Sequence, residues 1–262
     1  RTREIEKSII KRFRKEIWRP FVKALNEYEM IQEGDQIAVC ISGGKDSMLL
    51  AKCMQEILRH GKMEFGLKFL VMDPGYREEN RKLIHENARI LGIPIHVFET
   101  EIFDTVVDVE DSPCYLCARM RRGNLYANAR ELGCNKIALG HHFDDAVETF
   151  FLSLFYEGRI SCFQPVTYLD RMGITQIRPM LYCGEWMLRK AAEREHLPVV
   201  FNPCPADGYT KRQEVKELIH SLSKEYPDLR EKVFSAMQRL PLPAWEPQDH
   251  RRRPLADDGR EE

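Results

Sequence analysis

Short apolar runs alternate with amphipathic stretches over most of this chain. Runs rich in β-branched residues predict buried strands at 37–41, 65–72, 95–98, 136–140 and 198–201. Helical periodicity predicts helices at 48–58, 77–91, 114–132, 146–156, 184–195, 211–225 and 228–239. Residues 158–176 are expected to be turn-rich. Strands that alternate with helices favour an α/β fold with a doubly wound, mainly parallel sheet and helices on both faces.

The two ends of the chain have patterns of their own. Apolar residues recur at every fourth position from Ile5 to Phe21 and predict one amphipathic helix over 3–28. The basic residues on its other face are Lys7, Lys11, Arg12, Arg14, Lys15 and Arg19. They suit either a solvated face or a surface that contacts RNA. Proline and charge predominate after residue 240 and predict a disordered tail over 241–262, so we expect an N-terminal helix at 1–30 and the domain at 31–240.

Composition limits the classes of protein that remain. A chain of 262 residues with 43% hydrophobic content can bury a full core. The formal net charge is −1, so any nucleic-acid footprint must be local. No apolar run approaches the length of a membrane span, and we expect a soluble cytoplasmic protein with no membrane partner. In that compartment paired cysteines hold metals or do redox work more often than they form disulfides, and this chain has eight cysteines.

The clearest chemical motif is Ser42-Gly43-Gly44-Lys45-Asp46-Ser47, between the first predicted strand and the next helix. The glycines allow a tight turn, and the helix start beyond them presents free N–H groups and the positive end of the helix dipole. Lys45 adds a mobile positive charge, and the serine hydroxyls add donors. The spacing differs from that of a Walker P-loop. It matches the pyrophosphate loop of the ATP pyrophosphatases, which split ATP into AMP and pyrophosphate, and so predicts ATP binding.

Two more strand ends should lie beside this loop. Open α/β sheets hold their ligands at the carboxyl ends of neighbouring strands. The second predicted strand ends at Met72 and Asp73, and the fourth ends at Gly140, whose backbone is expected to line the nucleotide. Asp144 and Asp145 follow at a helix start. There they suit either helix capping or the orientation of Mg²⁺ or a substrate base.

The cysteines fall into two groups. Cys114 and Cys117 form a C-x-x-C pair at a predicted helix start, which suits metal ligation or redox exchange. The best third ligand is Cys204, in a rigid turn after the last predicted strand. Three thiolates suffice for a [4Fe-4S] cluster that keeps one iron free of protein ligands. Cys40 and Cys53 are instead expected to be small buried hydrophobes.

Three arginines project from the helix that carries the cysteine pair. They are Arg119, Arg121 and Arg122. A solvated face would explain them, but their position beside a cluster site favours phosphate binding, of RNA or of ATP.

Taken together, these motifs resemble the tRNA 2-thiocytidine synthetase family, the cluster-dependent tRNA thiolases of the ATP pyrophosphatase group. The matching segments are Ser42–Ser47, Cys114–Gly123, Leu139–Thr149, Ile177–Met180 and Asn202–Cys204. Many family members carry a second cysteine three positions after the last ligand, whereas this chain has Asp207. That leaves Cys204 as the only local ligand. The terminal zinc-finger cysteines of a sister family, which makes 2-thiouridine, are missing here.

The resemblance implies a mechanism. ATP would place its phosphates on Ser42–Ser47 and its adenine near Met72–Asp73, with Mg²⁺ assisted by Asp46. The enzyme would adenylate the C2 oxygen of a base, cytidine by the resemblance, while Lys45 and the loop amides stabilise the departing pyrophosphate. A sulfide on the open iron of the cluster would then displace AMP. Asp145 and Arg121 are the candidates for positioning the base and the adenylate.

The resemblance also implies tRNA as a partner, a sulfur donor such as a cysteine desulfurase or free sulfide, and a homodimer. Other functions remain open on the residues alone. One is a cluster-free ATP pyrophosphatase that joins an amine or ammonia to an adenylated substrate. Another is a nucleotide-binding or redox-sensing module without turnover, against which the intact Lys45, Asp46 and Asp145 argue. A third is a cluster enzyme that removes sulfur from thiolated bases, which would have little need for the ATP loop.

Overall fold

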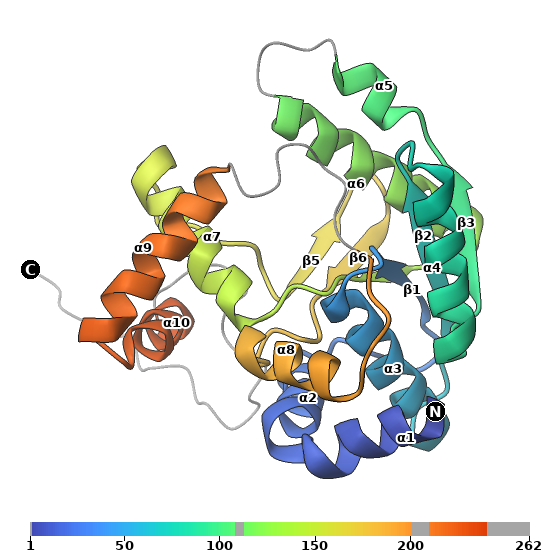
Figure 1. Ribbon diagram of the computed structural model, residues 1–262, viewed down its shortest axis with the longest axis horizontal. Coiled ribbons are helices and arrows are strands. Elements are labelled where there is room, and N and C mark those ends of the chain that lie inside the picture. Colours follow the sequence, from blue (N-terminus) through green and yellow to red (C-terminus); the bar gives the residue numbers. More distant parts are fainter. Residues whose placement is uncertain (1, 108–112, 201–209, 240–262) are drawn as a thin grey trace, which may run out of the picture.

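The fold is built on one twisted sheet. A computed structural model describes residues 2–107, 113–200 and 210–239 (Figure 1). Within those ranges six strands pair in the order β3-β2-β1-β4-β6-β5. The strands are β1 (Gln36–Ile41), β2 (Gly66–Asp73), β3 (Ile95–Glu99), β4 (Lys136–Ala138), β5 (Val166–Leu169) and β6 (Ile174–Ile177). All pairs are parallel except β5 with β6, which confirms the expected mainly parallel, doubly wound sheet.

Helices cover both faces of this sheet. Those on the face with the larger core are α3 (Lys45–His60), α4 (Glu78–Leu91), α8 (Glu185–Arg194) and the N-terminal segment. Helix α6 (Pro113–Glu131) packs on the opposite face, and the short α5 (Ile102–Val107) precedes it. The helices that gather at the left of Figure 1 are α7 (Phe143–Glu157), α9 (Lys211–Glu225) and α10 (Leu229–Arg239). No helix in the described ranges combines the length and apolar character needed to cross a lipid bilayer.

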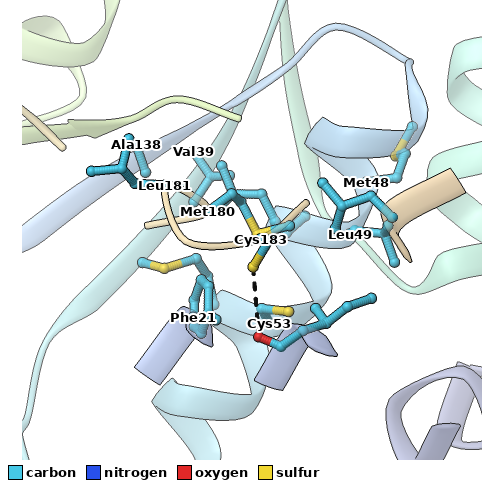
Figure 2. Packing of buried hydrophobic residues seen from close by; sticks show 14 of the residues in the cluster. Phe21, Val39, Met48, Leu49, Cys53, Ala138, Met180, Leu181 and Cys183 are labelled. Carbon is cyan, nitrogen blue, oxygen red and sulfur yellow. Dashed lines mark hydrogen bonds between the residues drawn. The ribbon is translucent and has the colours of Figure 1, made fainter. Parts of the chain in front are cut away.

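The larger core joins the sheet to α3 and the N-terminal segment. Figure 2 shows Val39 of β1, Leu49 of α3 and Phe21 of the N-terminal segment packed together. Cys53 and Cys183 are fully buried among them, and the Cys183 thiol lies 3.6 Å from the carbonyl oxygen of Ile17. Burial raises the pKa of both thiols, so they stay neutral. Cys53 is therefore the small buried hydrophobe that the sequence predicts.

The N-terminal segment is helical as predicted, but it is not one regular α-helix. It consists of α1 (Thr2–Lys7), two π-helical stretches (Ser8–Arg12 and Arg14–Trp18) and α2 (Arg19–Glu27). A strict four-residue repeat drifts about 40° around an α-helix at each step, because each residue turns the helix by about 100°. The wider π turns reduce this drift. As a result, all five apolar residues of the repeat, Ile5 to Phe21, are buried on one side.

Other predictions about the elements were incomplete or wrong. The segment 158–176 contains most of the β5–β6 hairpin, whose strands are too short to show a clear alternation. The described part of the predicted strand 198–201 pairs with no strand; its Val200 N–H instead donates to the carbonyl oxygen of Gly43 at 2.9 Å. Helix α5 was not predicted. Residue 201, Cys204 and the predicted tail at 241–262 lie outside the described residues.

A buried ion-pair network fixes the N-terminal segment to α3. The Glu6 carboxylate lies 2.6 Å from the Lys52 ammonium, which has no exposed surface, and 2.7 Å from the Arg59 guanidinium. Lys52 also donates to the carbonyl oxygen of Leu91 at 2.9 Å. Burial raises the pKa of Glu6, but the hydrogen bonds from Arg59 and Lys52 outweigh it and hold that pKa at about 2. Glu6 therefore stays ionised well below neutral pH.

We expect Glu6→Gln to lower the free energy of unfolding by about 3 kcal/mol at pH 7, because it leaves the Lys52 charge buried without its carboxylate. A carboxylate with a depressed folded-state pKa stabilises the fold above its unfolded value, and the contribution is lost as pH falls through the folded value. The difference between wild type and variant should therefore shrink from about pH 5 to pH 2. Urea unfolding at several pH values measures it. Glu86→Gln removes an exposed pair with Arg89 and is the control; it should show a much smaller trend, because solvent screens that pair.

Candidate active site at the carboxyl end of the sheet

A pocket of ≈300 Å³ opens where β1, β2 and β4 end. Chain connections leave β1 and β4 in opposite directions across the sheet, and open α/β sheets bind their ligands at such a switch point. The lining residues are Cys40, Ile41, Ser42, Asp46, Ser47, Met72, Tyr76, Arg121, Leu125, Leu139, Gly140 and His141. Six of the predicted site residues, from four separate segments, thus meet in one pocket.

The predicted pyrophosphate loop forms the floor of this pocket. Ser47 Oγ donates to the carbonyl oxygen of Gly44 at 2.9 Å and lies 3.2 Å from Ser42 Oγ. Gly44 is the N-cap of α3, so the first amides of that helix have no acceptor within it. Gly43 has φ +85°, in the left-handed region, and a β-carbon there would lie 3.2 Å from Val200 Cβ. The hydrogen bonds of its serines and the close packing of residue 200 therefore fix the conformation of the loop.

We expect Gly43→Ala to weaken ATP binding at least tenfold, because the loop must shift to relieve both the φ strain and the contact with Val200. Equilibrium ATP binding measures the loss. Gly34→Ala is the matched control: Gly34 has φ +82°, but a β-carbon added there would meet nothing within 4 Å, and Gly34 does not line the pocket. It should cost similar stability while ATP affinity stays at the wild-type value. Equal ATP affinities for the two variants would contradict this role of the loop.

Charged side chains surround the lysine of the loop. Lys45 Nζ lies 2.9 Å from Asp46 Oδ2 and 3.7 Å from Glu185 Oε1. Burial raises the pKa of Glu185, but its contacts with Lys216 and Lys45 outweigh burial and lower that pKa to about 2. The second oxygen of Asp46, Oδ1, is buried and has no hydrogen-bond partner in the described part of the chain. A carboxylate oxygen with free lone pairs in this place suits a hard divalent cation.

The two predicted strand-end residues of β2 have different environments. Met72 lines the pocket. The Asp73 side chain instead accepts hydrogen bonds from the N–H groups of Gly75 and Tyr76, at 2.9 and 2.6 Å, and lies 2.6 Å from Arg81. It thus shapes the turn that brings Tyr76 to the pocket.

The aspartates after β4 also differ from each other. Asp145 and His142 form a capping box at the start of α7, in which the His142 N–H donates to Asp145 Oδ2 at 2.9 Å. Asp145 Oδ1 lies 3.6 Å from the Arg212 guanidinium of α9. Asp144 accepts a hydrogen bond from the Glu185 N–H at 2.7 Å and is mostly buried. One oxygen of Asp145 therefore has the capping role, and the other faces a cation.

Helix α6 brings a basic group to the pocket and carries a thiol one turn away from it. Arg121 lines it, with its guanidinium carbon 5.5 Å from the Phe103 ring centre and its buried Nε without a hydrogen-bond partner among the described residues. Arg119 and Arg122 are exposed. Cys117 is half-buried and lies one helical turn before Arg121. The side chain of Cys114 and all of Cys204 lie outside the described part, within which no three His, Cys, Asp or Glu side chains gather around a metal-sized space.

Several groups at this site received no definite role from the sequence. His141 lines the pocket, and its ring centre lies 5.0 Å from that of Phe163 with the two rings tilted by 31°. Its buried Nδ1 lacks a hydrogen-bond partner in the described ranges. Burial and the nearby Arg178 charge lower the pKa of His141 to about 4, so the ring is neutral at physiological pH. Arg178 lies in a segment that matches the resembled family, but it received no role. Cys40 packs partly buried against the smaller core and also lines the pocket, so the predicted burial holds only in part.

Comparison with known proteins gives a consistent picture. The model of the PP-loop domain family matches residues 13–222. The tRNA-cytidine(32) 2-sulfurtransferase of Saccharophagus degradans is 34% identical over 248 residues, which cover 91% of this chain and 79% of the relative. That of Alkalilimnicola ehrlichii is 38% identical over 226 residues, 83% of this chain and 70% of the relative. The fold is similar to that of the U34-tRNA thiolase NcsA from Methanococcus maripaludis, with TM-score 0.68, 20% identity, and 85% and 78% of the two chains covered.

Proposed function

The chain belongs to the PP-loop family and, within it, to the tRNA-cytidine(32) 2-sulfurtransferases, and from this premise we propose that it replaces the C2 oxygen of a tRNA cytidine with sulfur at the expense of ATP. The observation that carries the proposal is the shared pocket. The pyrophosphate loop and the helix of the C-x-x-C pair, far apart in sequence, both line it, through Asp46 and Arg121. Activation by ATP and delivery of sulfur would then occur beside each other.

The loop would bind the triphosphate. The open amides at the start of α3 and the Lys45 ammonium would contact the phosphates, and the end of β2 at Met72 would lie against the adenine. Asp46 Oδ1, buried and unpartnered among the described residues, fits a Mg²⁺ ligand. The phosphates would draw Lys45 away from Asp46 and Glu185. This exchange would free the Asp46 carboxylate for the cation.

The cysteines would hold the sulfur carrier. Cys117 is half-buried on the turn of α6 next to Arg121, and Cys114 lies one turn earlier in the sequence. Val200 bonds to Gly43 of the loop, and the four residues from there to Cys204 span at most about 14 Å of chain. This donor set suits a [4Fe-4S] cluster, which, with three thiolate ligands, would supply sulfide from its one iron without a protein ligand.

The remaining groups would position the base and the adenylate. Arg121 has a guanidinium whose buried Nε needs an acceptor, which a phosphate oxygen of the adenylate would provide. The neutral His141 ring offers one donor and one acceptor to a base in the same pocket. Asp145, held by its capping box, would orient the base through the Oδ1 that now faces Arg212.

Two further features of the proposal concern the sulfur source and the location. The sulfur would come from a cysteine desulfurase or from free sulfide, and a cytoplasmic location fits an enzyme that acts on tRNA.

The chain would act as a homodimer. Exposed apolar side chains at and just after the end of α7 support this, because a second copy would remove them from water. They are Leu154, Phe155, Tyr156 and Ile160.

The experiment that tests the proposal is an anaerobic incubation with unmodified tRNA, MgATP and sulfide, followed by mass analysis of the nucleosides. We expect 2-thiocytidine, together with AMP and pyrophosphate in equal amounts. ATP splitting that needs an amine or ammonia, with unmodified tRNA, would favour a cluster-free ligase instead. A protein that binds ATP and releases neither product would be a module without turnover.

A further inference from the structure

A second groove, of ≈530 Å³, lies between the N-terminal segment and α10. It shares no lining residue with the nucleotide pocket. The residues that give it its chemical character are Lys15, Arg19, Lys23, Phe143, Tyr182 and Phe234. Three are cations and three are aromatic, and they come from four separate parts of the chain. One carboxylate, that of Glu231, also lines the groove, so its side chains carry three positive charges against one negative charge.

The aromatic residues form one wall. The ring centres of Phe143 and Phe234 are 4.8 Å apart, and those of Tyr182 and Phe234 are 5.8 Å apart. Gln238 donates to the Tyr182 hydroxyl at 2.9 Å, so the wall also carries polar groups at its edge. Packing holds these rings in place, because Phe234 belongs to the core and Phe143 and Tyr182 pack against that core partly buried. A flat ring could stack here at small entropic cost.

The cations form the opposite edge. All eight Lys and Arg side chains of residues 2–27 are exposed, although the whole chain has a formal net charge of −1. Lys23 Nζ lies 4.9 Å above the Tyr182 ring. Lys15 and Arg19 have no ion-pair partner in the described part of the chain. Such a concentration of exposed positive charge on one segment indicates a polyanionic partner.

We propose that this groove binds a nucleotide of the tRNA outside the reacting position, with its phosphate against Lys15 and Arg19 and its base against the aromatic wall. Proteins recognise unpaired RNA by this combination of stacking and phosphate contacts. The groove lies near one candidate residue of the active site. Phe143, which lines the groove, precedes Asp145 by two residues at the start of α7. The inference rests on the proposed function, since it takes tRNA as the substrate.

Equilibrium binding of an unmodified tRNA transcript to the full chain, without ATP, tests the groove. We expect the double variant Lys15→Glu with Arg19→Glu to bind at least tenfold more weakly than wild type. The plot of log affinity against log salt should become shallower by about 0.7–0.9, because the contact with one phosphate is lost. The matched control reverses two exposed charges outside the groove, Lys62→Glu with Arg130→Glu, and should bind nearly as wild type does.

A second variant tests the aromatic wall without changing charge. Ser235→Trp fills the groove from α10 and should weaken tRNA binding while the salt slope stays near the wild-type value. Thermal melting of each variant checks that it is folded. Affinities equal to those of the control in both groove variants would overturn the inference and leave a protein partner as the occupant, with the proposed function untouched. Wild-type protein that binds no tRNA would contradict the proposed function as well.

Discussion

We expect Lys45→Met to leave the chain folded and to lower the rate of tRNA-dependent pyrophosphate release by about 10²- to 10³-fold. Negative charge develops on the departing pyrophosphate, and loss of one well-placed donor at such a charge costs a factor of this size. The fold should survive because Lys45 is half-buried and, within the described residues, its ammonium forms ion pairs only with Asp46 and Glu185. A coupled assay for pyrophosphate measures the rate.

Lys216→Met is the matched control. Lys216 makes a tighter contact with Glu185 than Lys45 does, 2.8 against 3.7 Å, but it lies on α9 and not on the loop. Its loss should slow the reaction by less than tenfold. If the two variants slow the reaction equally, the charge network around Glu185 matters rather than the loop lysine, and the assignment of Lys45 is wrong.

Cys117→Ala should abolish tRNA thiolation and remove the iron, while ATP still binds with wild-type affinity. The variant loses one of three proposed thiolate ligands but no group of the pyrophosphate loop. Iron and labile sulfide assays on anaerobically purified protein measure the first effect, with about four irons per wild-type chain expected. ATP binding measured on the same samples shows that the nucleotide pocket is intact.

Cys134→Ala is the control for this prediction. Cys134 is a buried thiol in the smaller core, two residues before β4 in the sequence. Burial raises its pKa. Its replacement should cost a little stability and leave the iron content unchanged. A Cys117→Ala protein that retains a full complement of iron and sulfide would place the cluster on other residues.

Local signals explain why so much of the fold could be predicted from the sequence. Strands β1, β2 and β4 are short, largely apolar runs with glycine or aspartate close to their ends. Helix α9 was predicted with its observed bounds, Lys211–Glu225. The β5–β6 hairpin was missed because four-residue strands carry too few positions for a period to show. The π turns of the N-terminal segment were also missed, although the strict four-residue repeat is the signal that could have revealed them.

The site was predictable where one stretch of sequence contains both the chemistry and the geometry. The pyrophosphate loop is such a stretch, because the same six residues form the turn and supply the donors. Contacts made across the fold were not predictable. Arg212 reaches Asp145 from α9, and Phe163 brings His141 and Arg178 together, since the ring centre lies 5.0 Å from the first and 4.7 Å from the second. Nothing in the local sequence of these residues indicates their partners.

Asp73 shows a residue whose place in the sequence suggests a ligand contact that its side chain does not make in the structure. Its place at the end of β2 is the place where ligand-binding residues occur in such sheets, and the position alone pointed to the nucleotide. In the structure its carboxylate is buried against the N–H groups of the next turn and the Arg81 guanidinium. Sequence position predicts which edge of the sheet a residue occupies. It does not predict whether the side chain turns towards the pocket or back into the chain.

The central claim is that ATP activates the C2 carbonyl of the base. A tRNA whose cytidines carry ¹⁸O at C2 tests it most directly, with AMP and pyrophosphate analysed by mass spectrometry after one round of thiolation. If the carbonyl oxygen attacks the α-phosphorus and AMP then leaves the base, the account predicts ¹⁸O in AMP, in the same amount as the 2-thiocytidine formed, and none in pyrophosphate. Thiolated tRNA formed together with unlabelled AMP would contradict adenylation of the base.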